Sequence, residues 1–326
     1  MYQNKTVLLI GGGGTLGTYI TRELLRLGCR VDVICLEDYK SQNEKLRYLR
    51  GQATEEYLRE IVTRNHYHGI VNLIHYPDVE AYQPIHRLLT ANTDHLIFLS
   101  SYRVYADEQH PITESAPMLL DVSKDEHFLA NEKYALAKAR AERYIYGQSD
   151  IKNWTIVRPV ISFSERRFDL VTRSGRYVID CVAAGKKITL PQRSKNLTAG
   201  LDWAGNTGKI IANLLFQECA LGQAYTISSA PNLTWGQVAD IYEKVLGADI
   251  EWIDSDDYLR EMGPGDPYWT LVNDRFFDRK IDNRKVLVAT GLKKEDFMTI
   301  EYGLKEELKR LNEQKERWKN ESNSGK

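Results

Sequence analysis

Two polar side chains four residues apart, Tyr134 and Lys138, could carry acid–base chemistry. They lie in the stretch NEKYALAKARAERYI, whose alanines and long side chains favour a helix. Residues four apart on a helix face the same way, so the lysine ammonium would lie close to the tyrosine hydroxyl. A nearby positive charge lowers the pKa of a phenol from about 10 and makes it usable as a proton donor or acceptor. Because Y-x-x-x-K also occurs on many solvated helices, the pair needs a second signal.

Two serines supply that second signal. Ser100 and Ser101 directly follow the apolar run HLIFL, which is typical of a buried strand. Ligands of open parallel sheets bind at the carboxyl ends of the strands. A serine hydroxyl at such an end can hydrogen-bond a substrate carbonyl or alcohol while the tyrosine moves the proton.

A glycine-rich turn near the start of the chain could hold a dinucleotide. The stretch VLLIGGGGTLGTYI places four consecutive glycines between an apolar run and a helical pattern. Such a turn lets backbone N–H groups approach a diphosphate at a helix N-terminus, where a Cβ would collide. Two registers fit: Gly12, Gly14 and Gly17 as G-x-G-x-x-G, or Gly11, Gly14 and Gly17 as G-x-x-G-x-x-G. The glycines alone do not separate the two.

The elements that would position these residues alternate between short strands and helices. Leucines and an isoleucine recur at helical spacing from Leu16 to Leu27, and Gly28 closes that helix. Strand–helix alternation predicts an α/β fold, a doubly wound parallel sheet covered by helices on both faces. The strands are expected at Thr6–Ile10, Val31–Cys35, Leu46–Leu49, Ile70–Ile74, Leu96–Leu99, Thr155–Val157 and Ala224–Ile227.

Beyond Pro159 the pattern loosens, which indicates a smaller, discontinuous C-terminal substrate lobe. We expect a helix over Leu201–Phe216, another from Thr234 to Gly247, and a loop over 262–270 because of its glycines and prolines. The dinucleotide-binding lobe would comprise residues 1–159 and 200–227. The substrate lobe would comprise residues 160–199 and 228–326.

The order of these motifs resembles the extended short-chain dehydrogenase/reductases, the NAD-dependent epimerase/dehydratase family. IGGGGTLG is similar to the family's glycine turn, FLSSYRVY to its serine motif and YALAK to its Tyr/Lys pair. TIVRP, LDWAGNTGKII and AYTISSAPNLTWGQVADIYEKVLG are similar to its later landmarks, so the resemblance covers nearly the whole chain. It implies a Rossmann fold and selects the register Gly11, Gly14 and Gly17.

The resemblance also implies a chemistry, reversible hydride transfer between nicotinamide C4 and a carbon bearing a hydroxyl. Tyr134 would be the acid/base, Lys138 would lower its pKa and hold the nicotinamide ribose, and Ser101 would orient the substrate oxygen. By family analogy the substrate is a small molecule of the nucleotide-sugar type. The implied cofactor-binding residues are Gly11, Gly14, Thr15, Leu16, Gly17, Glu37, Gln52, Tyr134, Lys138 and Pro159.

The residues that would hold the adenosine depart from the family pattern. The second strand usually ends in an acid that holds the ribose hydroxyls, but this chain has Cys35 there, so Glu37 is the candidate. The acids Glu37 and Asp38 would repel a 2′-phosphate and no arginine directly follows, so we expect NAD rather than NADP. Gln52 stands where the family tends to carry an aspartate, and its amide can still pair with adenine.

Composition and charge narrow the function classes. The chain has 326 residues, 42% hydrophobic and 27% charged, and a net charge of −1, so it has no electrostatic footprint for nucleic acid or an anionic membrane. No apolar run approaches the roughly 18 residues of a membrane span, and no signal peptide is seen, so we expect a cytoplasmic protein with reduced thiols. His66 and His68 have no carboxylate or cysteine at ligand spacing, so no metal is expected.

Three hypotheses stay open. The first is a sugar epimerase or dehydratase, the second a simple reductase or dehydrogenase of a non-sugar carbonyl compound, and the third a non-catalytic nucleotide sensor or RNA-binding relative. The serine, tyrosine and lysine weigh against the third. A homodimer also stays open, because the family's usual dimer-forming helix motif is absent from the short stretch after the fourth strand. The expected substrate lobe contains four arginines that could clamp a phosphate or carboxylate, or lie in an exposed loop. They are Arg166, Arg167, Arg173 and Arg176.

Overall fold

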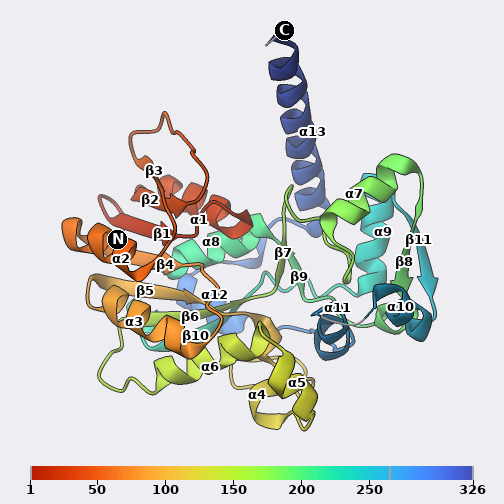
Figure 1. Ribbon diagram of the computed structural model, residues 1–326, viewed down its shortest axis with the longest axis horizontal. Helices are drawn as coiled ribbons and strands as arrows, with labels where there is room; N and C mark the ends of the chain where they lie inside the picture. Colours follow the sequence, from red (N-terminus) through yellow and green to blue (C-terminus); the bar gives the residue numbers. More distant parts are fainter. Residues whose placement is uncertain (1, 264–265, 325–326) are drawn as a thin grey trace.

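A parallel sheet of seven strands forms the centre of the computed structural model, which describes residues 2–263 and 266–324 (Figure 1). The strand order is β10-β6-β5-β4-β1-β2-β3, and every pair is parallel. The winding reverses between β1 and β4, where ligands of doubly wound folds bind. The predicted fold class is confirmed. The strands are β1 (Thr6–Ile10), β2 (Arg30–Cys35), β3 (Leu46–Arg50), β4 (Tyr67–Asn72), β5 (Thr93–Leu99), β6 (Trp154–Pro159) and β10 (Gln223–Ile227).

Helices cover both faces of this sheet because its strands are apolar on both sides. In β1, Val7 and Leu9 belong to one buried cluster, whereas Leu8 and Ile10 belong to the cluster on the opposite face. The first cluster is completed by α1 (Thr15–Arg26), α8 (Ala204–Leu214) and α12 (Arg284–Thr290). The second is completed by α2 (Glu55–Arg64), α3 (Val79–Thr90) and α6 (Ala135–Tyr146).

A second group of elements, most of which lie on the right in Figure 1, has its own apolar core. Val178, Leu190 and Val238 are fully buried in that core. The boundaries of the two lobes stay predictions. The elements are β8 (Lys187–Pro191) paired with β11 (Asp249–Ile253), β7 (Ile161–Phe163) paired with β9 (Leu201–Trp203), and α7 (Gly175–Ala184), α9 (Trp235–Leu246) and α10 (Ser255–Met262).

Four further helices complete the described part of the chain. The last one, α13 (Ile300–Ser324), extends away from the body (Figure 1). Of the helices in the described part of the chain, none is both long and apolar enough to cross a membrane. The others are α4 (Leu119–Val122), α5 (Glu126–Asn131) and α11 (Asp266–Thr270), with short turns at Tyr102–Val104, Gln192–Ser194, Glu218–Ala220, Leu271–Arg275 and Lys294–Asp296.

Two sequence expectations are corrected by the structure. The helix expected over Leu201–Phe216 begins only at Ala204, because residues 201–203 form β9 against β7. The loop expected over 262–270 contains the short helix α11. Pro267 lies in the first turn of that helix, a position that proline tolerates. Residues 264 and 265 of that expected loop lie outside the described residues.

Candidate active site

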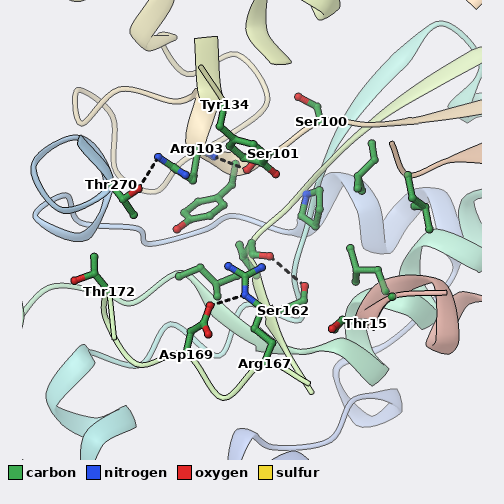
Figure 2. A pocket seen from close by; sticks show the side chains of 18 of the residues that line it. Thr15, Ser100, Ser101, Arg103, Tyr134, Ser162, Arg167, Asp169, Thr172 and Thr270 are labelled. Carbon is green, nitrogen blue, oxygen red and sulfur yellow. Dashed lines mark hydrogen bonds and ion pairs between the residues drawn. The ribbon is translucent and has the colours of Figure 1, made fainter. Parts of the chain in front are cut away.

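A cavity of about 570 Å³ lies at the carboxyl ends of β1, β4, β5 and β6 (Figure 2). Ser101, Arg103 and Tyr134 lie along one side of it in Figure 2, and the segment from Arg167 to Thr172 lies along the opposite side. The cavity therefore brings together side chains from both groups of elements. Of the residues proposed from the sequence, it is lined by Gly11, Gly14, Thr15, Leu16, Gly17, Ser101, Tyr134 and Pro159.

The glycine turn has a separate physical reason for each glycine of the G-x-x-G-x-x-G register. Gly11 has φ +76°, a backbone conformation that residues with a Cβ rarely adopt. A Cβ at Gly17 would lie 2.2 Å from the carbonyl oxygen of Gly12, so α1 packs on the turn only with glycine there. At Gly14 a Cβ would meet nothing within 4 Å, and this open side belongs to the cavity. Gly12 does not line the cavity but packs against Val33.

The N-terminus of α1 suits an anionic group. The N-cap residue is Gly14, and no side chain caps the helix. The first N–H groups of a helix have no acceptor within it and lie at the positive end of its dipole. Because Thr15, Leu16 and Gly17 line the cavity, these donors fit a diphosphate placed there.

Ser101 and Tyr134 are presented to the cavity by neighbouring elements. Ser101 follows β5, and its Oγ accepts a hydrogen bond from the backbone N–H of Arg103 at 3.2 Å. Tyr134 directly precedes α6, and its half-buried ring has its centroid 5.2 Å from that of His75. The guanidinium carbon of Arg103 lies 5.2 Å from the centroid of the same ring. Both hydroxyl-bearing side chains line the same cavity.

Lys138 lies one turn after Tyr134 but is buried, with 2% of its surface exposed. Its Nζ donates to the carbonyl oxygens of Leu99 at 2.6 Å and Ile74 at 3.0 Å, and it lies 5.0 Å from the centroid of the Phe98 ring. Burial lowers the pKa of this ammonium to about 7. The lysine is not among the cavity-lining residues, and main-chain carbonyls near the ends of β4 and β5 hold it in place.

A buried ion pair fixes α6 against the sheet. Arg158 in β6 and Glu142 in α6 are each 1% exposed, and Arg158 Nη2 lies 2.5 Å from Glu142 Oε2. The Ser100 hydroxyl also donates to the Glu142 carboxylate. The pair therefore ties the helix that follows Tyr134 to the two strands that end at the cavity.

The four arginines proposed as an anion clamp do not act as one group. Arg167 lines the cavity and its Nε lies 2.6 Å from Asp169 Oδ2, whereas Arg166 lies at the glycine turn. Arg173 binds Thr189 and Glu261, and the exposed Arg176 pairs with Asp180. The sequence analysis did not propose several of the lining residues, although Arg103 lies within the serine motif FLSSYRVY itself. The missed ones include the polar residues Arg103, Ser162, Asp169, Thr172, Thr270 and Arg275.

At the adenosine end, only one of the two candidate residues lies beside the glycine turn. A Cβ on Gly13 would lie 2.8 Å from Glu37 Oε2, so the Glu37 carboxylate lies against the turn. Gln52 is exposed after β3, and neither residue lines the cavity. Their roles toward adenosine stay predictions.

His66 and His68, for which the sequence showed no carboxylate at ligand spacing, have the carboxylate of Asp94 beside them. Ligand atoms of His66, His68 and Asp94 lie within 4.8 Å of one another. However, the backbone N–H of Thr6 donates to His68 Nδ1 at 3.1 Å, so the neutral ring carries its proton on Nε2. Because that proton occupies the nitrogen left for a metal, the arrangement opposes metal binding.

Comparisons with other proteins identify the family of this chain and solved structures with a similar fold. Residues 7–204 match the NAD dependent epimerase/dehydratase family, and no curated protein sequence matches the chain. Similar solved structures include an epimerase from Methanothermobacter thermautotrophicus, with 14% identity, coverage of 98% of this chain and 95% of that chain, and a TM-score of 0.73. UDP-glucose 4-epimerase from Thermus thermophilus, in complex with NAD, has 17% identity, coverage of 94% and 99%, and a TM-score of 0.66. The enzyme WbmG from Bordetella bronchiseptica, in complex with NAD and UDP, has 15% identity, coverage of 95% and 96%, and a TM-score of 0.68.

Proposed function

The chain belongs to the NAD-dependent epimerase/dehydratase family, and we propose that it catalyses hydride transfer between NAD and a substrate carbon that bears a hydroxyl or carbonyl group. One observation carries this proposal. One cavity is lined by the glycine turn, the uncapped start of α1, Ser101 and Tyr134, although Gly11 and Tyr134 are more than 100 residues apart in the chain. Such a cavity can hold a dinucleotide and a substrate oxygen side by side.

Each residue of the site has a separate role in this proposal. NAD, when bound, supplies the hydride acceptor and donor. Tyr134 takes the proton from the substrate hydroxyl at its Oη, or returns it, and Ser101 Oγ orients the same substrate oxygen. Lys138 uses two of its three donors on main-chain carbonyls, which leaves one for the nicotinamide ribose.

The substrate class is a nucleotide sugar. WbmG, which shares this fold, is solved with NAD and UDP. The side of the cavity away from the glycine turn is polar, with the hydroxyls of Thr172 and Thr270 and the ion pair of Arg167 and Asp169. Such donors and acceptors suit a molecule with many hydroxyl groups.

The first experiment identifies the nucleotide and tests the tyrosine. Purified protein is denatured and the released nucleotide is identified by mass spectrometry, with NAD(H) as the expected result. Tyr134→Phe should abolish turnover and leave NAD affinity nearly unchanged, because it removes only the proton-carrying oxygen. Tyr146→Phe at the far end of α6 is the matched control, since Tyr146 lies outside the cavity. Normal turnover by Tyr134→Phe would remove the assignment of the acid/base.

The same preparation separates the two enzymatic hypotheses. An epimerase or dehydratase reoxidises its own cofactor, so the absorbance of reduced nicotinamide shows no net change during turnover. A simple reductase or dehydrogenase consumes added cofactor in proportion to product. Candidate nucleotide sugars and non-sugar carbonyl compounds are therefore compared by product formation and by nicotinamide absorbance together.

A further inference from the structure

The segment after β7 crosses to the glycine turn and contacts it at two points. Ser164 Oγ lies 3.0 Å from Thr15 Oγ1, at the start of α1. Arg166 Nη1 donates to the carbonyl oxygen of Gly13 at 2.5 Å, and Nη2 donates to the Tyr39 hydroxyl at 3.1 Å. Because Arg166 is 153 residues from Gly13 in the chain, only folding brings a cation to this turn.

The body of the protein sets the position of this segment. The backbone N–H of Glu165 donates to Glu307 Oε2 in α13 at 2.8 Å. The Glu307 side chain is fully buried and also accepts hydrogen bonds from Trp203 Nε1 at 2.7 Å and from the Tyr19 hydroxyl. The residue before Arg166 is therefore anchored, while the Arg166 side chain itself is 42% exposed.

The guanidinium of Arg166 has weak acceptors where it now lies. Its two close partners are a neutral carbonyl and a phenol, and its nearest ion-pair carboxylate, Glu165, is 3.8 Å away. A phosphate oxygen is a stronger acceptor for this cation, because its negative charge adds Coulomb attraction to the hydrogen bond. Arginine can also bind a diphosphate with two parallel donors. The turn that Arg166 contacts is the one whose free helix N–H groups fit that diphosphate.

We propose that Arg166 is a cofactor-binding residue that exchanges the Gly13 carbonyl for a phosphate oxygen of NAD, so that residues 164–166 form a strap over the diphosphate. This inference rests on the proposed function, because it requires NAD at the glycine turn. The strap lies between the glycine turn and α13, so it also hinders release of the cofactor. A tightly held cofactor suits an enzyme that reoxidises it in every turnover.

The 2′-phosphate of NADP is the competing ligand for the same arginine. The Glu37 carboxylate lies against the turn close to Arg166, and it would repel a phosphate on the adenosine ribose. The helix N–H groups proposed for the diphosphate lie at the start of α1, and Asp169, a carboxylate that lines the same cavity, is paired with Arg167. The diphosphate is therefore the ligand that the test addresses first.

The test measures binding rather than activity, on the full-length protein. Nucleotide-free wild type, Arg166→Gln, Arg166→Lys and the control Arg176→Gln are titrated with NAD, ADP, adenosine and NADP by calorimetry. We expect Arg166→Gln to weaken NAD and ADP by about 10- to 100-fold, as for loss of a hydrogen bond to a charged group. Adenosine should bind all variants equally, Arg166→Lys should lose less, and Arg176→Gln should match wild type because Arg176 is exposed on α7. Release of NADH, followed by its fluorescence in stopped flow, should be at least about tenfold faster from Arg166→Gln.

Each other outcome has a defined meaning. Equal NAD affinity in wild type and Arg166→Gln overturns the inference and leaves the proposed function intact. A loss confined to NADP means that Arg166 reads the 2′-phosphate, and it also overturns the inference. Equal losses for adenosine and ADP mean that the substitution damages the turn rather than a phosphate contact, which again counts against it. If wild type itself binds no NAD, the proposed function fails together with the strap.

Discussion

Replacing Lys138 with methionine should change how stability depends on pH, which tests the buried ammonium directly. The side chain is 2% exposed, and burial lowers its pKa from 10.5 to about 7. Between pH 7 and 10.5 the unfolded chain binds this proton and the folded chain does not. The free energy of unfolding of the wild type therefore rises with pH through that window, and the slope vanishes below pH 7, where both states carry the proton.

The size of the effect follows from the pKa difference. A shift of about 3.5 units at about 1.36 kcal/mol each amounts to about 5 kcal/mol across the whole window. Between pH 7 and 9 the wild type should gain about 2 kcal/mol from this one group. Lys138→Met also leaves the carbonyls of Ile74 and Leu99 without their donor, but that cost does not depend on pH. The difference in slope, rather than the difference in stability at one pH, is therefore the readout.

The assay is urea unfolding of nucleotide-free protein at pH 7, 8 and 9. Wild type and the control Lys124→Met, whose lysine is exposed, should show the rise, and Lys138→Met should be flatter by about 2 kcal/mol over the range. Parallel curves for wild type and Lys138→Met would refute the reasoning, because the ammonium would then titrate alike in the folded and unfolded chains.

Three further predictions concern the ion pair, the glycine turn and the adenosine end. Glu142→Ala leaves the buried Arg158 guanidinium without its carboxylate partner and should lower the free energy of unfolding by about 3–5 kcal/mol in urea denaturation; a loss below about 1 kcal/mol would contradict the tight pairing. Gly17→Ala should destabilise the fold, because its Cβ would lie 2.2 Å from the Gly12 carbonyl oxygen. Gly14→Ala should have the thermal stability of wild type and lose NAD affinity, because its Cβ enters the open cavity. Equal thermal stabilities of Gly17→Ala and Gly14→Ala would show that the turn is not packed as described. Glu37→Ala should weaken NAD binding by about 1.5–3 kcal/mol in calorimetry if its carboxylate holds the adenosine ribose, and unchanged affinity would place that contact elsewhere.

Much of the fold could be predicted because its signals are local. Apolar runs and helical spacing located all seven strands of the central sheet and the first helix, and the doubly wound class followed from their alternation. The family was predicted from the glycine turn, the strand-end serines and the Tyr/Lys pair, and NAD from the acids after the second strand; the family match confirms both. The helix expected over 201–216 was wrong at its start, because Leu201–Trp203 pair with a strand that is 40 residues away in the chain. The assignment of individual site residues stays a prediction, with Tyr134→Phe as its first test.

By itself the sequence predicted which residues could carry chemistry and which backbone turn could approach a diphosphate, because both predictions rest on residue type and near-neighbour spacing. It did not determine where Lys138 finds its partners, since those are main-chain carbonyls near the ends of two other strands. Only the tertiary structure decided that Arg166 lies over the glycine turn while the adjacent Arg167 faces the cavity. Residues 165 and 166 form a tight turn, which the backbone N–H of Arg167 closes by donating to the Ser164 carbonyl oxygen at 2.8 Å. Neighbouring side chains in such a turn point in different directions, and only the packing of distant elements settles what each one reaches.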